Sequence, residues 1–314
     1  NNHGTFSAVL SGEGTGLKFN NCRMKRNLPI YLAVLLTPSL LSAQIIINDS
    51  WTDGDRASTG VLDADWWSSN STGGNSVEVA VGELGMVTGT SGRGIHGTFA
   101  PQTLGVGDRL IVTATFTTPS TVGSDRGGAF KMALADFNDA GLAADLSSSS
   151  SSVNPLYTSL PGYMVDFDIN TGSEDISIRK HTDPNTSGRF LGTTGEWDSL
   201  GSSSDDGYSI TGETEYFSVM AFDRIGLDSL EITGSISQGG VLLDTHTETD
   251  TSGIANNFGM LGFWANSNTF GSTNSADPDN GITFTNITIE RIPEPSSAGL
   301  LLLGSLLVFR RRRS

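Results

Sequence analysis

The feature that most constrains the fold is a two-residue alternation of apolar and polar side chains, which recurs through the middle of the chain. Residues 109–117 carry apolar side chains at every second position, at Leu110, Val112, Ala114 and Phe116. The same spacing, rich in β-branched residues, recurs at 163–169, 176–178 and 230–236, and further apolar runs lie at 258–265 and 281–290. Because successive strand residues point to opposite faces, this pattern predicts β-strands with one buried face. Clusters of Gly, Ser, Asn and Asp between the runs predict turns.

The segment 44–292 is expected to fold as one domain. Its length of about 250 residues suits a single large sandwich, and we interpret the serine run at 147–152 as an exposed loop because both sides of it alternate alike. We therefore predict an all-β fold, a single antiparallel β-sandwich (jelly roll), with an N-terminal signal helix and a short C-terminal apolar helix outside it. The runs at 45–56 and 281–292 are predicted to lie together. The alternation slips by one residue at Asn286, which predicts a β-bulge.

The charge of this domain disfavours nucleic acid as a partner. Between Gln44 and Ile292 the sequence has 10 Lys and Arg residues against 32 Asp and Glu residues. Such a body repels a phosphate backbone and suits a self-repelling extracellular domain. The one cysteine, Cys22, lies before the domain, so the domain has no disulfide, thiolate metal site or cysteine nucleophile.

The first 43 residues indicate export. Lys25 and Arg26 precede an apolar stretch at 28–41, and small residues lead to an expected cleavage between Ala43 and Gln44. This order is typical of a secretory signal peptide, here 24–43, and the stretch is too short for an ordinary spanning helix of about 20 residues. Since the first methionine is residue 24, we expect residues 1–23 to be a non-native upstream extension and the mature chain to begin near Gln44.

Residues 293–314 hold three features in succession. Pro293-Glu294-Pro295 comes first, an apolar stretch follows at 298–309, and the chain then has Arg310, Arg311, Arg312 and Arg313. As a helix the stretch is about 18 Å long against a hydrocarbon core of about 30 Å, which suits a temporary anchor. We expect the arginines to stop transfer on the cytoplasmic side, and the prolines to keep the preceding segment extended for a processing enzyme.

In order, spacing and position, these three features resemble a PEP-CTERM sorting signal. The resemblance implies passage through the export translocon, transient retention in the inner membrane, recognition by an exosortase and cleavage near Pro293-Glu294-Pro295. It also implies delivery to the cell surface or extracellular matrix, often in the company of exopolysaccharide. A plain tail anchor is the alternative interpretation of the same residues.

The long strands, the acidic body and the neighbouring terminal runs resemble the concanavalin A-like lectin and glucanase sandwich. Glucanases of this fold carry catalytic carboxylates on a strand, and Asp166 and Asp168 share one face of a predicted strand, but the Glu-x-Asp-x-x-Glu spacing is missing. The structural alternative is a pairing of Ile169 with Ile176. Asp166 then faces Arg179 across the strands as an ion pair.

Two further groups of residues are candidates for ligand binding. Sugar stacking is a hypothesis for four tryptophans, with core packing as the alternative: Trp66, Trp67, Trp197 and Trp264. Adjacent strand residues point to opposite faces, so at most one of the first two belongs to the core beneath. Calcium binding is a hypothesis for four aspartates, with ordinary acidic turns as the alternative: Asp53, Asp55, Asp277 and Asp279.

No residue pattern supports catalysis. Gly92–Gly97 matches Gly-x-Gly-x-x-Gly, but no helical period follows it as a dinucleotide site requires, so we predict a glycine-rich loop. His96, His181 and His246 are widely separated in sequence. We therefore expect a non-enzymatic exported surface or matrix protein with no cofactor. A lectin-like module, with Ca²⁺ as a candidate ion, is the first alternative, and a glycan hydrolase is the second.

Overall fold

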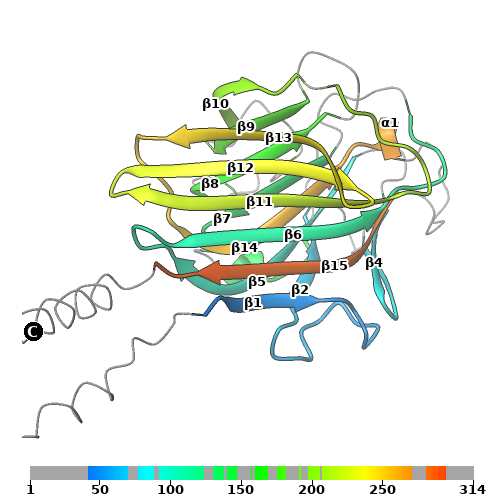
Figure 1. Ribbon diagram of the computed structural model, residues 1–314. Coiled ribbons are helices and arrows are strands. Elements are labelled where there is room, and N and C mark those ends of the chain that lie inside the picture. Colours follow the sequence, from blue (N-terminus) through cyan, green and yellow to red (C-terminus); the bar gives the residue numbers. More distant parts are fainter. Residues whose placement is uncertain are drawn as a thin grey trace, which may run out of the picture. The chain divides into compact units, whose positions relative to one another are not determined.

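The computed structural model of the chain describes residues 42–69, 77–87, 92–123, 130–137, 140–146, 157, 160–168, 175–181, 191, 197–205, 207–270 and 281–294. These residues belong to one compact unit, Leu40–Ser297, and form two antiparallel sheets (Figure 1). The predicted signal helix, the apolar helix and the arginine cluster lie outside the described residues. Within the described residues, no helix has the length and apolar character needed to cross a membrane.

The sheets are called A and B here. Sheet A has eight strands, in the order β13 (Val241–Asp250), β12 (Ser229–Gln238), β11 (Glu215–Gly226), β6 (Arg109–Thr117), β15 (Gly281–Ile292), β4 (Glu83–Val87) and β3 (Val77–Ala80), with β1 (Gln44–Asp49) also paired to β15. Sheet B has seven, in the order β10 (Trp197–Ser203), β9 (Ile176–His181), β8 (Gly162–Phe167), β7 (Phe130–Ala135), β14 (Asn257–Ala265), β5 (Arg93–Thr103) and β2 (Asp65–Ser68). Two short helical segments, η2 (Ala140–Leu142) and α1 (Ser267–Phe270), complete the described elements.

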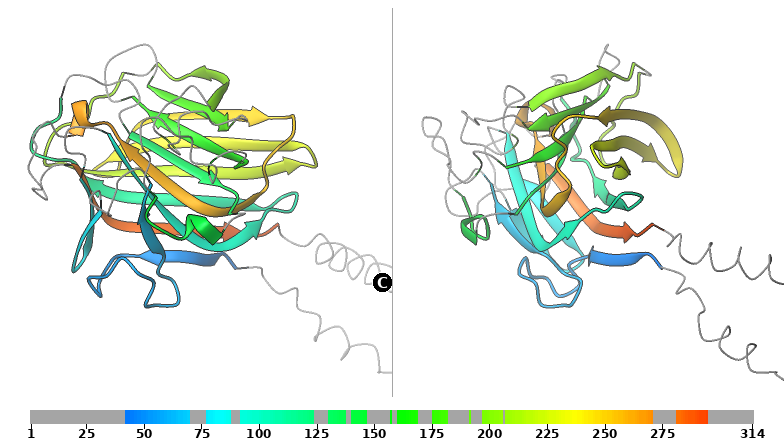
Figure 2. Two further views of the ribbon diagram at one scale, coloured as in Figure 1. Left: turned by 180° about the vertical axis from the view of Figure 1, so that it is seen from behind. Right: turned by 90° about the vertical axis from the view of Figure 1, so that its left-hand side faces the viewer.

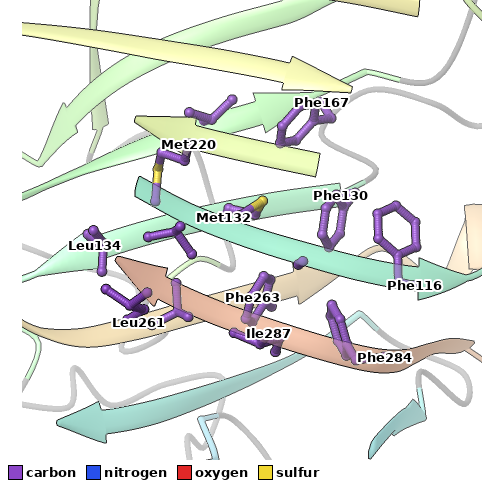
Figure 3. Close-up of a cluster of buried hydrophobic side chains, with 14 of the residues drawn as sticks. Phe116, Phe130, Met132, Leu134, Phe167, Met220, Leu261, Phe263, Phe284 and Ile287 are labelled. Carbon is purple, nitrogen blue, oxygen red and sulfur yellow. The ribbon is translucent and has the colours of Figure 1, made fainter. Parts of the chain in front are cut away.

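The two sheets pack face to face (Figure 2), and aromatic side chains fill the core between them. Strands β6 and β12 alternate buried with half-buried or exposed side chains, which confirms the predicted sandwich pattern. The ring centroid of Phe116 in sheet A lies 4.8 Å from that of Phe130 in sheet B, and Phe284 lies 4.7 Å from Phe263 (Figure 3). Rings at these distances bury large apolar areas and prefer specific tilted or stacked arrangements. This cluster therefore fixes how the sheets stack.

Sheet B is also covered on its outer face, which the alternation did not predict. Strands β7 and β8 are buried at every residue. Along β7, Met132 and Leu134 belong to the core, whereas the intervening Ala133 and Ala135 belong to a second apolar cluster. That cluster, the outer cluster, also contains Met164, Trp197, Met260 and Trp264 from the strands and Leu142, Leu146, Tyr157, Leu160 and Leu191 from the connections after β7 and β9. These connections thus cover sheet B on the side away from sheet A.

The first and last strands are neighbours, as predicted. Gln44 of β1 lies opposite Arg291 of β15 in antiparallel register. The pairing of β15 with β6 shifts register between Phe284 and Asn286, which confirms the predicted bulge. Because β1, β4 and β6 all pair with β15, the last strand before Pro293 is held along both of its edges.

The predicted glycine-rich loop at Gly92–Gly97 was wrong, because Arg93 onward forms strand β5. A Cβ placed on Gly97 would lie 3.0 Å from the Trp66 ring, and one on Gly94 would lie 3.2 Å from the Trp264 ring. Glycine in a strand allows such close approach. The spacing that resembled a cofactor motif therefore makes room for a tryptophan on each face of the strand.

Candidate functional site

Asp166, the predicted catalytic candidate, forms a buried cross-strand pair with Lys131 on the outer face of sheet B. The two residues lie opposite each other on β8 and β7. The Nζ of Lys131 is 4.0 Å from the Oδ2 of Asp166, and both side chains are about 5% exposed. The Lys131 Nζ also donates a 3.4 Å hydrogen bond to the carbonyl oxygen of Leu191. The carboxylate is thus engaged by a cation beneath the outer cluster.

The predicted pairing of Asp166 with Arg179 was wrong. Arg179 lies opposite Met164, and Asp166 lies opposite Ser177. The prediction was displaced by two residues, and a displacement of two leaves every side chain on its original face. Periodicity therefore predicted the correct face of the sheet for Asp166. It could not distinguish between registers that differ by two residues. Asp168 lies just after β8, and its backbone N–H donates to the carbonyl oxygen of Asp175.

Three of the four candidate tryptophans are buried. Trp66, Trp197 and Trp264 are 0%, 2% and 6% exposed; Trp66 belongs to the core and the other two to the outer cluster. Trp67 is half-buried, and the guanidinium carbon of Arg56 lies 5.8 Å from its ring centroid. Packing therefore accounts for the positions of the three buried rings, and only the Trp67 ring retains partial exposure.

A buried carboxylate ties Trp66 to the first strand. The indole Nε1 of Trp66 donates a 2.8 Å hydrogen bond to Asp49 Oδ2, and the backbone N–H groups of Trp51 and Ala64 donate to the same carboxylate. Burial raises the pKa of Asp49, and these hydrogen bonds only partly offset the rise. Asp49 therefore holds β1, the following loop and β2 together, which is a structural role.

The candidate histidines lie on three different strands, β5, β9 and β13. His96 is fully buried, and its Nε2 is 2.6 Å from the carbonyl oxygen of Leu142. Burial lowers its pKa to about 4, so the ring is neutral at pH 7 and its Nε2–H is the donor. His181 packs edge-on against Trp197 at 4.8 Å. His246 lies 3.2 Å from a carboxylate oxygen of Glu248.

The candidate calcium ligands Asp53 and Asp55 stabilise the turns that contain them. Asp53 accepts hydrogen bonds from the backbone N–H of Asp55 and from the Thr59 hydroxyl, and Asp55 accepts one from the Ala57 N–H. The hydrogen bond from Thr59 is the main cause of a lowered Asp53 pKa. Asp277 and Asp279 lie outside the described residues. Among the residues that are described, no group of three or more His, Cys, Asp or Glu could hold a metal ion.

A shallow groove that the sequence analysis missed lies on the outer face of sheet A. It has a volume of about 280 Å³ and is lined by Glu83, Thr117, Thr118, Pro119, Ser120, Glu213, Gly281, Thr283 and Thr285. Thr117 and Thr283 are cross-strand partners, and the adjacent Phe116 and Phe284 point into the core, so the two threonines face away from it. Hydroxyl groups both donate and accept, and the two carboxylates accept. The groove is therefore suited to a ligand rich in hydroxyl groups.

The first residues of the candidate sorting motif follow β15 directly. Pro293 and Glu294 are described, and Pro295 is not. The backbone N–H of Glu294 donates a 3.0 Å hydrogen bond to Asp108 Oδ1 in the turn between β5 and β6. Burial alone would raise the pKa of Asp108, but hydrogen bonds from Arg291, Glu294 and Gly105 outweigh it and leave that pKa lowered. At the other end of the domain, Ala43 precedes β1, which begins at Gln44.

Comparison with models of known protein families finds no match, and comparison with curated proteins finds no relative. Among solved structures, the chain is similar to a basic winged bean lectin (TM-score 0.42, 11% identity, 80% of this chain and 98% of that chain). It is also similar to the carbohydrate recognition domain of Emp46p (TM-score 0.45, 8% identity, 77% of this chain and 94% of that chain). An endo-1,3-beta-glucanase from Streptomyces sioyaensis is a further match (TM-score 0.41, 14% identity, 80% of this chain and 97% of that chain). These likenesses are too distant to carry a functional argument.

Proposed function

We propose that the chain is an exported cell-surface or extracellular-matrix protein, sorted through residues 293–314, with the sandwich as non-catalytic cargo. One observation carries the proposal. Pro293-Glu294-Pro295, the apolar stretch at 298–309 and the arginines at 310–313 follow, in that order, immediately after the last strand, which ends at Ile292. The partners implied are the export translocon, the inner membrane during transit and an exosortase.

The arrangement of the two terminal strands supports this proposal. The expected signal peptide ends at Ala43 and β1 begins at Gln44. Since Gln44 lies opposite Arg291, the points where the signal peptide joins the domain and where the sorting segment leaves it are adjacent. A precursor held by both hydrophobic segments can therefore attach to one membrane surface without any rearrangement of the sandwich.

The proposal is tested by replacing Pro293, Glu294 and Pro295 with alanine in the full chain, in a host that has the cognate processing enzyme. We expect the unmodified chain to be trimmed and released, and the variant to accumulate in the membrane fraction with at least about a ten-fold slower loss of the tail, because the extended recognition segment is gone. Pulse-chase labelling with fractionation measures this. Glu290→Ala, four residues upstream, is the matched control and should be trimmed normally. A chain that stays untrimmed in every form contradicts the proposal.

Carbohydrate binding is a second candidate function, favoured by the hydroxyl-lined groove on sheet A. Five hydroxyl side chains and two carboxylates line it, and one of these hydroxyls, that of the buried Thr118, already donates to the Thr211 carbonyl oxygen. The other hydroxyls can donate to or accept from a sugar hydroxyl, and the carboxylates can accept from one. An extracellular polysaccharide of the matrix is the class of ligand that this chemistry fits. The buried Lys131–Asp166 pair adds nothing to this hypothesis, because the outer cluster covers it.

A glycan array probed with Thr117→Val/Thr283→Val tests the second candidate. Because each change removes one hydroxyl from the groove, we expect Kd for the best glycan to rise about ten-fold. The control is Thr113→Val/Thr288→Val, a hydroxyl pair 2.5 Å apart on the same two strands but outside the groove, and it should leave Kd unchanged. Repeating the array in EDTA reports on the candidate calcium ligands. Equal binding by both double variants would remove the groove from consideration.

A further inference from the structure

We propose that the turn between β5 and β6 is a docking site for the chain's own sorting motif, and that it holds Glu294 away from the processing enzyme until the segment detaches. This inference rests on the proposed sorting function, because it assigns a regulatory contact to that same segment. The occupant is the backbone and side chain of Glu294, and the site consists of Gly105, Gly107 and Asp108.

Asp108 is the centre of the docking site. Its carboxylate accepts the Glu294 N–H on Oδ1 at 3.0 Å, and on Oδ2 it accepts the Gly105 N–H at 2.8 Å and an Arg291 guanidinium N–H at 2.6 Å. Its side chain is only 9% exposed. Hydrogen bonds to an ionised acceptor shielded from water are stronger than neutral ones at the surface. The same carboxylate therefore binds the last strand through Arg291 and the sorting motif through Glu294.

Gly107 lets the side chain of Glu294 lie on the turn. A Cβ placed on Gly107 would be 2.5 Å from Cγ and 2.6 Å from Cδ of Glu294, and the residue has φ +89°. Glycine adopts that conformation at little cost. Arg224 fixes the turn itself, since its carbonyl oxygen accepts the Gly107 N–H and its N–H donates to the Asp108 carbonyl oxygen. The turn is thus held by contacts that do not involve the motif.

Docking and processing exclude each other, because the chain between a docked Glu294 and the apolar stretch is too short for the enzyme to surround the motif. From a docked Glu294 to Ala298, where the apolar stretch begins, the chain extends at most about 14 Å. An enzyme that reads Pro293-Glu294-Pro295 must surround an extended backbone within that distance, while one side of Glu294 faces the sandwich. Only chains with an undocked motif can then be processed, so the apparent rate of processing is proportional to the fraction of chains that are undocked. The contact makes cleavage depend on release of the segment from the folded domain.

The test compares Asp108→Ala with the unmodified full chain. In cells with the processing enzyme, the variant should be trimmed about ten-fold faster, because the charged acceptor is lost and the undocked fraction rises. In the purified precursor in detergent, hydrogen exchange at the Glu294 amide should be about ten-fold slower in the unmodified chain than in the variant. Asp223→Ala is the matched control, because it removes an exposed ion pair with Arg109 that does not touch the motif.

The two readouts separate this inference from the proposed function. Exchange at the Glu294 amide of the unmodified chain that is slower than in an unstructured peptide of the same sequence supports docking even if Asp108→Ala fails to fold, because that comparison needs no variant. Fast exchange at Glu294 in the unmodified chain, or trimming of a folded Asp108→Ala variant at the unmodified rate, overturns the docking inference. If neither form is trimmed, the sorting function fails, and the exchange rate still decides whether the motif docks.

Discussion

Replacing Phe130 with alanine is expected to lower the free energy of unfolding by about 4 kcal/mol, in the range for a fully buried phenylalanine. Phe130 is 0% exposed and lies beside Phe116 in the buried cluster between the sheets (Figure 3). Its ring centroid is 4.8 Å from that of Phe116 in sheet A, and 5.6 Å and 6.1 Å from those of Phe167 and Phe263 in sheet B. The change therefore removes buried area and leaves a cavity where the two sheets meet.

Urea denaturation followed by intrinsic fluorescence measures the effect as a lower midpoint at an unchanged slope. Phe217→Ala is the matched control. Phe217 is 40% exposed on the outer face of β11, and its loss should change the free energy of unfolding by no more than about 0.5 kcal/mol. Similar losses from Phe130→Ala and Phe217→Ala would contradict the assignment of the core.

Replacing Lys131 with alanine is expected to lower the free energy of unfolding by about 3–5 kcal/mol, the usual cost of removing one member of a buried ion pair. The change removes the cation 4.0 Å from the Asp166 carboxylate, in a place where both side chains are about 5% exposed. Replacing both residues with apolar ones of similar size, Lys131→Met/Asp166→Leu, should cost less, because no buried charge is left behind.

The matched control for the buried pair is the exposed ion pair between Arg109 and Asp223. Their N and O atoms are 3.5 Å apart, but the side chains are 45% and 29% exposed. Arg109→Ala should therefore change the free energy of unfolding by less than about 1 kcal/mol. Thermal denaturation of the four proteins at one pH gives the comparison. A double apolar variant that is less stable than Lys131→Ala would contradict a buried charged pair at this position.

Alternation predicted both the strand and its exposure where one face turns towards water; at 163–169 it predicted the strand β8 but not the burial of that strand's second face. In β6 and β12 the core residues Leu110, Val112, Leu230 and Ile232 are separated by residues that are half-buried, so the period is visible in the sequence. The outer cover of sheet B was not predictable in this way. It comes from connections distant in sequence, such as those that contain Leu142 and Leu191, and periodicity within a strand carries no information about them.

Predicting the candidate sites requires knowledge of which residues pair between strands, and the sequence specifies this register only in part. Thr117 and Thr283 are ordinary polar positions until the pairing of β6 with β15 places them opposite each other. Asp108 follows the sequence Gly-Val-Gly, and this pattern predicts only a turn. The contact of Asp108 with Glu294 could not be predicted, because it depends on where β15 ends. The motif at 293–313 is different, because it is recognised from the order of its residues alone, without knowledge of the fold.

The central claim is that the two ends of the chain direct an independent sandwich to the cell exterior, and it is tested most directly by the termini of the mature protein. Intact-mass and terminal-peptide analysis of the protein recovered from cells with the processing enzyme gives both ends. The account predicts a chain that starts near Gln44 and ends near Pro293-Glu294-Pro295. A mature chain that still carries Arg310–Arg313 contradicts it.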